Sequence, residues 1–216
     1  MDKLVISRFT EDVLWIKEYE LDYIIYNKGN DLDSSFNWIR KENVGENQKD
    51  IFSFIVDNYE NLPNSVGFVQ GFPFDHCKKE TFDVLKNNYK LTRLEDYKHL
   101  IPCPNVDQDG FYFENNDNWY IAAHNSSRNQ SCQFNSFDEF MSSIFSNYSH
   151  LDRLQFSPGS QIIVEKERIL FYPKKFWNHL CNILNRRSMT EGHIIERSLF
   201  LIFSNVYVVR EEFNEL

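Results

Sequence analysis

The stretch from Lys3 to Gly29, KLVISRFTEDVLWIKEYELDYIIYNKG, predicts a strand, a short helix and a second strand. Its two apolar runs, KLVIS and DYIIYN, are bounded by polar residues, a pattern typical of buried strands. Between them, Thr10 suits the N-cap of a helix with Glu11 and Asp12 in its first turn, where carboxylates meet the positive end of the helix dipole. The chain is therefore expected to begin as an α/β fold.

The alternation of strands and helices continues beyond this stretch. Apolar residues between Asn47 and Tyr59 recur at helical spacing, and SVGFVQ at Ser65–Gln70 is a third apolar run. Since parallel neighbours need crossover connections, this order predicts an α/β fold with a mostly parallel sheet flanked by helices. Ligands of such sheets bind at the carboxyl ends of the strands, so the polar residues that follow the three strands are expected along one rim.

The middle of the chain predicts a short irregular insertion, because residues 92–135 hold prolines, many Asn and Asp, and scattered aromatic pieces. After SPGS, the run QIIVEKERI predicts a strand that leads into a turn. Helices are expected over Phe137–Tyr148, capped by Ser136, over Tyr172–Leu184 and over Glu191–Phe203. No internal repeat or linker is evident, so residues 1–216 are predicted to form a single domain.

The charge balance disfavours free nucleic acid as a partner. The chain has 23 Lys and Arg against 32 Asp and Glu, a formal net charge of -9, and phosphates repel such a chain. A local basic patch would have to override this sum. The best candidates for one are Lys174, Lys175, Arg186 and Arg187, although such pairs usually form a solvated face.

The sequence also predicts a cytoplasmic protein. Its start, MDKLVISRFTEDVLW, lacks the basic and apolar regions of a secretory signal, and no apolar run approaches the roughly 20 residues of a membrane helix. The 4 cysteines are far apart in sequence, with no CxxC pair, so we expect reduced thiols.

Several short motifs leave alternatives open. Asp107 and Asp109 form an Asp-x-Asp pattern that can hold a divalent cation on a nucleoside diphosphate, or can be a polar turn. His76 follows Asp75 and suits metal binding, proton transfer or a structural hydrogen bond. Glu196, with the acidic, histidine and arginine residues around it, forms either surface ion pairs or a carboxylate that points into a cleft as a base.

Taken in order, these pieces resemble a widespread group of bacterial and fungal proteins known only as a domain of unknown function. The resemblance rests on SRFTEDVLWI, DYIIYNKG, FVQGFPFDH, GSQIIVEKERI and EGHIIERSLFLIF, with YNKG and QGxPxDH the most specific, and runs from Leu4 to Phe203. Those proteins are similar to GT-A-type glycosyltransferases. The resemblance implies a Rossmann-like domain for a nucleotide sugar.

The resemblance also assigns roles to residues that match the family's motifs. Substrate-binding positions would be Arg8, Glu11, Asp12, Asn27, Lys28, Gly29, Gln70, Gly71, Gly159, Gln161 and Arg197. Asp75 would hold a divalent cation, Mn²⁺ or Mg²⁺, and Glu196, or else His76, would take the proton of the acceptor hydroxyl. One departure is Glu46, which stands where the family usually has an arginine and would repel a phosphate.

The predicted function is therefore that of a glycosyltransferase that moves a sugar from a nucleoside diphosphate to a hydroxyl of a glycan or a small molecule. One alternative keeps this chemistry but takes modified DNA bases as acceptors, as phage enzymes do, against the charge of -9. Another is a catalytically silent nucleotide- or sugar-binding domain, with Glu46 as a sign of lost activity.

Overall fold

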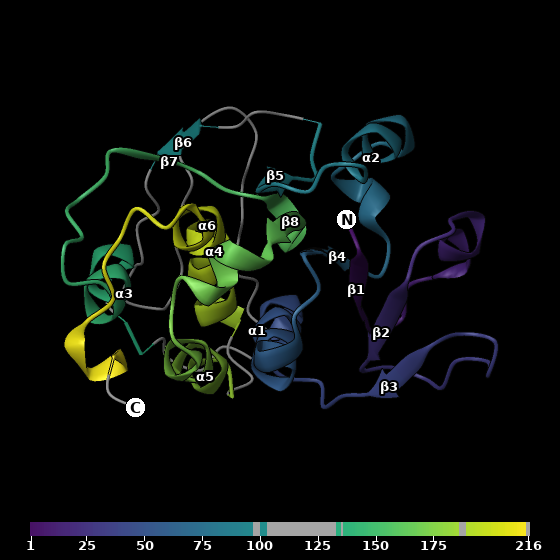
Figure 1. Cartoon of the computed structure of the whole chain (residues 1–216), viewed down its shortest axis with the longest axis horizontal. Helices are drawn as coiled ribbons and strands as arrows, with labels where there is room; N and C mark the ends of the chain where they lie inside the picture. Colours follow the sequence, from purple (N-terminus) through teal and green to yellow (C-terminus); the bar gives the residue numbers. More distant parts are fainter. Residues whose placement is uncertain (97–99, 103–132, 135, 186–188, 215–216) are drawn as a thin grey trace.

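The chain has a mixed α/β fold around a six-stranded, mostly parallel sheet (Figure 1). The computed structural model describes residues 1–96, 100–102, 133–134, 136–185 and 189–214. The sheet strands are β1 (Lys3–Arg8), β2 (Tyr23–Asn27), β3 (Trp38–Arg40), β4 (Ser65–Gln70), β5 (Thr92–Arg93) and β8 (Ile162–Glu165), in the order β3-β2-β1-β4-β8-β5. The first four strands in that order are mutually parallel, while β8 runs antiparallel to both β4 and β5.

Helices cover both faces of the sheet. The α-helices are α1 (Glu46–Asn58), α2 (Lys79–Leu85), α3 (Phe137–Ile144), α4 (Lys166–Leu170), α5 (Lys174–Ile183) and α6 (Met189–Ser204). Short 3-10 helices are η1 (Leu14–Glu18), η2 (Tyr59–Asn61), η3 (Pro73–Asp75), η4 (Pro158–Ser160) and η5 (Glu211–Phe213), and β6 (Leu100–Pro102) pairs with β7 (Arg153–Gln155) in a second sheet. Figure 1 shows α1, α5 and α6 on one side of the large sheet and α2 on the other.

Burial on both faces explains why the strands are continuous apolar runs. Successive residues of a strand point to opposite faces. In β4, Val66 and Phe68 belong to the hydrophobic core that includes α1, α5 and α6, while Val69 belongs to a second core with Trp15 and Phe82. A strand with a core on each side has no solvated face, so it shows no polar alternation.

The short helix that was predicted to start from an N-cap at Thr10 starts later and is of a different type. The chain forms only the 3-10 helix η1, which begins at Leu14. Glu11 Oε2 accepts hydrogen bonds from the N–H groups of Phe9 (2.7 Å) and Thr10 (3.0 Å), and Asp12 Oδ1 accepts one from Leu14 N (2.8 Å). These carboxylates close local turns, a use of acidic side chains that competes with the first turn of a helix.

The other expected elements are present with shifted bounds. The strand predicted from QIIVEKERI is the four-residue β8, and the chain then enters α4 at Lys166 rather than a turn. The helix predicted to Tyr148 ends at Ile144, but Ser136 caps it as expected, since its hydroxyl accepts a hydrogen bond from Glu139 N at 3.0 Å. The sequence did not predict β3 or α2.

Most of the predicted insertion lies outside the described residues. Its described parts include β5 and β6, and Asp107 and Asp109 fall outside them, so the Asp-x-Asp hypothesis stays a prediction.

Of the cysteines, Cys77 and Cys181 are described and are free thiols, as expected. No helix among the described residues is long and apolar enough to cross a membrane. The single-domain organisation also stays a prediction.

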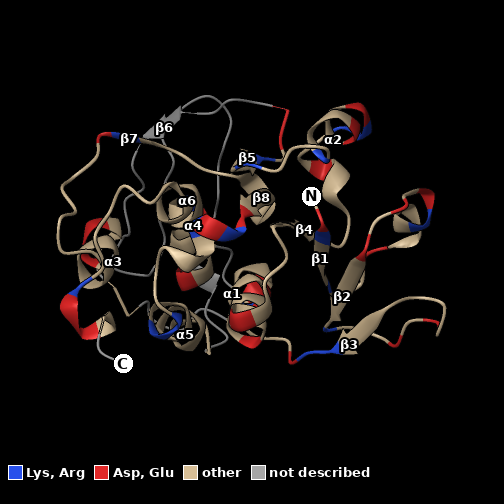
Figure 2. Cartoon of the chain, in the orientation of Figure 1, with Lys and Arg blue, Asp and Glu red and all other residues tan. Residues whose placement is uncertain are grey.

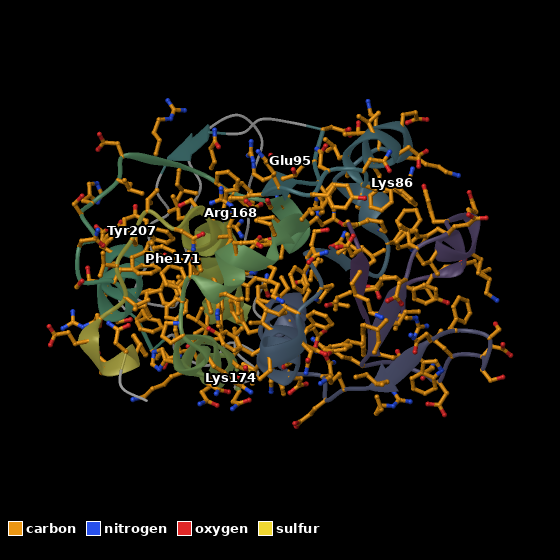
Figure 3. All side chains as sticks on the ribbon, viewed as in Figure 1. Lys86, Glu95, Arg168, Phe171, Lys174 and Tyr207 are labelled. Carbon is orange, nitrogen blue, oxygen red and sulfur yellow. The ribbon has the colours of Figure 1, made fainter. Side chains whose placement is uncertain are left out.

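Arg168 joins α4 to the carboxyl end of α6, and its position between them is visible in Figure 3. Its guanidinium donates to the carbonyl oxygens of Phe203 and Ser204, each at 3.1 Å, and to Glu165 Oε1 at 2.9 Å. The last carbonyls of a helix lack intrahelical partners and carry partial negative charge, which a cation offsets. This contact fixes the end of the helix that carries the predicted residues Glu196 and Arg197.

The Ser136 cap provides a test of the local structure. Ser136→Ala removes the acceptor of the Glu139 N–H and should lower the free energy of unfolding by about 1 kcal/mol in urea titrations. Ser142→Ala, at an exposed position of the same helix, is the matched control and should be neutral or slightly stabilising, since alanine has the higher helix propensity. Equal effects of the two changes would contradict the cap.

Candidate functional site

Polar side chains gather where the parallel strands β1, β2 and β4 end. Arg8 and Asn27 are register partners at the ends of β1 and β2, and Gln70 ends β4 opposite Ser7. The carboxyl ends of neighbouring parallel strands meet at the same edge of a sheet, which is the usual ligand site of open α/β folds. The structure thus brings Arg8, Asn27 and Gln70 together, as expected.

Arg8 is held in place by its own neighbours. Its Nε donates to the Glu11 carbonyl at 2.8 Å, and its Nη1 donates to Asn27 Oδ1 at 2.7 Å and to the Asn30 carbonyl at 3.0 Å. Asn27, fully buried, donates in turn to the Asn30 carbonyl at 2.8 Å. The guanidinium is therefore fixed across the ends of β1 and β2 before any ligand arrives.

Lys28 and Asp50 form a buried ion pair beside Arg8. Lys28 Nζ lies 3.0 Å from Asp50 Oδ2, and the two side chains are only 5% and 3% exposed. Lys28 also donates to the Glu46 carbonyl. Burial raises the pKa of Asp50, and the nearby Lys28 ammonium opposes that rise. Since a buried ion is stabilised mainly by its partner, Asp50 fixes the position of Lys28 at the cleft.

A cleft of about 140 Å³ opens at this edge of the sheet. It is lined by Ser7, Arg8, Phe9, Glu11, Lys28, Asn43, Glu46, Asn47 and Gln70. Glu46 and Asn47 are the first residues of the 13-residue helix α1, whose unsatisfied N–H groups and dipole favour a negative ligand. Two cationic side chains and a helix N-terminus therefore face the same small space, together with the carboxylates of Glu11 and Glu46.

The start of α1 has an unusual backbone. Gly45 and Glu46 both have positive φ angles, 68° and 50°. A β-carbon on Gly45 would lie 2.5 Å from the Leu184 carbonyl oxygen, so only glycine fits there. The positive φ angle is unfavourable for Glu46, which has a β-carbon. Its side chain is exposed at the cleft. The chain therefore places a carboxylate at the start of a helix, where the dipole would otherwise favour an anion.

Four of the predicted substrate-binding residues shape the rim rather than line the cleft. A β-carbon on Gly29 would overlap the Phe9 carbonyl, and the Gly71 carbonyl accepts a hydrogen bond from Trp15 Nε1 at 2.8 Å. Asp12 closes the turn before η1, as described above. Gln161 is fully buried and donates to the carbonyls of Pro73 (3.1 Å) and Leu94 (3.3 Å), which holds the segment after β4.

Gly159 joins three elements behind the cleft. Its φ is 66°, its N–H donates to Glu196 Oε1 at 2.7 Å, and its carbonyl accepts from Asn47 Nδ2 at 2.5 Å. A β-carbon there would lie 2.8 Å from both Gln70 Oε1 and His76 Cδ2. Glycine is needed for both the backbone conformation and this close approach. The turn therefore brings the predicted residues Gln70, His76 and Glu196 into one neighbourhood.

Glu196 is an ionised, well-held carboxylate. Burial alone would raise its pKa, but the adjacent Arg197 guanidinium, His193 and the Gly159 N–H lower the pKa to about 2. Arg197 is fully buried, pairs with Glu196 and lies 4.8 Å from the Phe156 ring centroid. His193 Nδ1 lies 3.8 Å from Glu196 Oε2. The catalytic role expected for Glu196 stays a prediction.

The described residues around Asp75 do not form a preformed metal site. Asp75 is exposed at the end of η3, and the described residues contain no cluster of three His, Cys, Asp or Glu side chains that could hold a metal ion. The metal role of Asp75 therefore stays a prediction that the described donor groups do not support. His76, its neighbour, lies against the Gly159 turn.

The Lys and Arg residues in the described part of the chain are not concentrated at the cleft. Figure 2 shows Lys and Arg residues spread over β3, β5, α4 and α5 as well as the ends of β1 and β2. Lys174 and Lys175, half of the candidate basic patch, are exposed on the first turn of α5, and Arg186 and Arg187 lie outside the described residues. Within the described part, an anion at the cleft would therefore be held by the few charges next to it and not by a broad positive surface.

Sequence reasoning missed three residues of this site. Asp50 was not assigned a role, although a carboxylate next to Ile51 on the apolar face of α1 signals a buried partner. Asn47, one turn before it, was assigned only to the helix start. His193 was noted only as a neighbour of Glu196, and its spacing of three residues on a helix was the available signal.

These features define an α/β protein with a polar cleft at the carboxyl ends of its parallel strands. The sequence model of the DUF3431 family, described as a protein of unknown function, matches residues 4–215, so the chain belongs to that family. No curated protein matches the chain. The expected membership of a family of unknown function is thus confirmed, and the likeness to GT-A-type glycosyltransferases stays a prediction.

The low pKa of Glu196 predicts a pH-dependent stability. A carboxyl whose pKa falls from 4.5 to about 2 on folding stabilises the protein above pH 4.5 and loses that effect as the pH falls toward 2. Glu196→Gln should therefore lower the free energy of unfolding by roughly 3 kcal/mol at pH 7, and the difference from wild type should vanish near pH 2. Urea titrations across this range measure both values.

Glu167→Gln is the control for that experiment, because Glu167 is exposed in the first turn of α4. Its difference from wild type should stay small at every pH, as expected for a surface carboxylate. A constant gap between Glu196→Gln and wild type from pH 7 to pH 2 would show that folding does not lower the pKa of Glu196.

Proposed function

We propose that this protein is a glycosyltransferase that moves a sugar from a nucleoside diphosphate to a hydroxyl acceptor, a glycan or a small molecule. The observation that carries the proposal is the cleft at the ends of β1, β2 and β4, where Arg8, Lys28 and the N-terminus of α1 converge. Fixed cations and backbone N–H groups at this edge are suited to the phosphates of a nucleotide. The GT-A-type, Rossmann-like assignment of the sheet is part of this proposal.

The chemistry of sugar transfer fits these groups. The bond between the anomeric carbon and the diphosphate breaks, and negative charge develops on the departing phosphate. Preorganised donors that face this charge lower the barrier, because they need not reorient during the reaction. Arg8 is fixed by Asn27 and Asn30, and Lys28 by Asp50, so both cations meet this requirement.

The divalent cation expected with such a donor does not fit the described residues as a preformed site. Glu11 and Glu46 are the carboxylates that line the cleft, and Glu11 already accepts hydrogen bonds from Phe9 and Thr10. We therefore assign the neutralisation of the diphosphate to Arg8, Lys28 and the N-terminus of α1.

Binding of UDP and GDP tests the proposal most directly. Each nucleotide should be titrated calorimetrically and screened by thermal shift, and one of them should bind saturably. A ligand at 100 times its dissociation constant stabilises the folded state by roughly 2.7 kcal/mol, which raises the melting temperature by several degrees. Arg8→Gln should weaken binding about tenfold, whereas Arg210→Gln, far along the chain in a pair with Glu212, should not. Failure of both nucleotides to bind would contradict the proposal.

Glu46 provides a second, opposite test. Its carboxylate lines the same cleft as Arg8 and Lys28, so it repels an anionic ligand. Glu46→Gln should raise the affinity for UDP or inorganic pyrophosphate by roughly three- to tenfold, as measured by calorimetry at low salt. Glu60→Gln, in η2 beyond the opposite end of α1, is the matched control and should leave the affinity unchanged. Unchanged affinity in Glu46→Gln would mean that the anion binds elsewhere.

A second candidate function has a specific observation in its favour. A catalytically silent nucleotide- or sugar-binding domain would tolerate the Glu46 carboxylate at the cleft, because it need not stabilise a departing diphosphate. The two candidates differ in turnover. A silent domain binds UDP-sugars or GDP-sugars and releases no free nucleoside diphosphate, whereas a transferase releases it with an acceptor or, slowly, with water.

A further inference from the structure

We propose that a second pocket, formed by α3, α5 and η5, binds a small carboxylic acid with an apolar body. The pocket has a volume of about 390 Å³ and shares no lining residue with the cleft at the strand ends. Figure 1 shows α3 and α5 on the side of the molecule away from β2 and β3. The inference goes beyond the proposed transferase function and does not depend on it.

The walls of the pocket are mostly apolar. Phe134, Ile183 and Phe213 line it, and the last two are otherwise buried, at 7% and 5% exposure. The Phe213 ring packs against His179, with ring centroids 4.9 Å apart, and the Phe134 ring packs against Phe140 at 5.2 Å. Pockets of roughly 300–1,000 Å³ with apolar walls and a few polar groups are typical sites of small ligands. These walls suit the apolar body of such a ligand.

The pocket runs along α5 from a polar end to an apolar end. Lys175, His179 and Ile183 are spaced by four residues, so they form one stripe about 12 Å long on this helix. Gln133 lies at the Ile183 end, because its Nε2 donates to the Ile183 carbonyl at 3.4 Å. Lys175 is in the first turn of α5, where the helix dipole favours negative charge. An elongated ligand with one anionic end matches this arrangement.

The charges at the polar end favour a carboxylate over a neutral group. Lys175 is exposed, and its ammonium has no ion-pair partner among the residues that the structure describes. Glu212 also lines the pocket, but Arg210 Nε lies 3.4 Å from its Oε1. Burial lowers the pKa of His179, with Glu212 opposing that shift, so the imidazole is mostly neutral at pH 7. A bound carboxylate can therefore pair with Lys175 without displacing an ion pair of the described residues.

Octanoate and 1-octanol are the probes for this site, because they have apolar chains of the same length and differ in charge at one end. Each is titrated into the full chain at low ionic strength, with ¹H–¹⁵N NMR shifts as the readout. Octanoate should bind saturably, with its largest shifts at residues of the pocket. Lys175→Met removes the ammonium but keeps an apolar stem, and should weaken octanoate about fivefold while leaving 1-octanol within about twofold.

Lys174→Met is the matched control for the charge. Lys174 is exposed in the same turn of α5 but does not line the pocket, so this change should leave the affinity for both probes as in wild type.

A second variant tests the cavity rather than the charge. Ser143, half-buried on α3, lines the pocket, and Ser143→Phe should fill part of it and weaken both probes at least about tenfold. Ser142→Phe, at an exposed neighbouring position outside the lining, is its control and should bind both probes as wild type does. Circular dichroism checks that each variant is folded.

Only a selective loss of octanoate in Lys175→Met supports the proposal. It is overturned if octanoate does not bind wild type at millimolar concentration, or if its affinity is unchanged in Lys175→Met. Equal losses of octanoate and 1-octanol in that variant would also overturn it, because the lysine would then not recognise the carboxylate. Nucleotide binding at the cleft has no bearing on these results, since the two sites share no residue.

Discussion

The turn at Gly159 is the constraint on which the rest of the site depends. Its N–H holds Glu196 on α6, its carbonyl holds Asn47 on α1, and its missing side chain leaves room for Gln70 and His76. Elements that are distant in sequence therefore meet at a residue that has no side chain and a positive φ angle. A larger residue would separate α6 from the end of β4, so the cleft and the groups behind it share one anchor.

The fold was predictable where one physical rule dominated the sequence. Strands covered on both faces are continuous apolar runs, and this rule located β1, β2 and β4. It failed for β3, where WIR at Trp38–Arg40 is three residues long and largely exposed. It also could not give the direction of β8, because an apolar run is compatible with either direction, and pairing with β4 decides it. Thr10 failed as a helix cap because the neighbouring carboxylates satisfy turns of their own.

The sequence predicted only those site residues whose positions follow from the order of strands and helices. Residues that directly follow parallel strands, such as Arg8, Lys28 and Gln70, meet at one edge, and the order of strands and helices was sufficient to find them. Asp50 and His193 had local signals, a carboxylate on the apolar face of α1 and a three-residue spacing on α6, but neither signal gives a position relative to the sheet edge. The sequence also located Glu196, but not how completely Arg197 and the Gly159 N–H enclose it, because the contact with Gly159 joins a turn distant in sequence to α6.

The charges at the cleft set the kind of ligand that an acidic protein of net charge -9 can hold there. Lys28 is largely neutralised by Asp50 at 3.0 Å, and Arg8 uses three of the five N–H donors of a guanidinium on the chain itself. What the cleft offers is therefore directional hydrogen bonding more than net positive charge, and the Glu46 carboxylate lowers that net charge further. Hydrogen bonds of this kind act over a few ångströms and do not draw anions from a distance. For the nucleotide sugar proposed above, recognition would then depend on contacts with the sugar as well as with the phosphates.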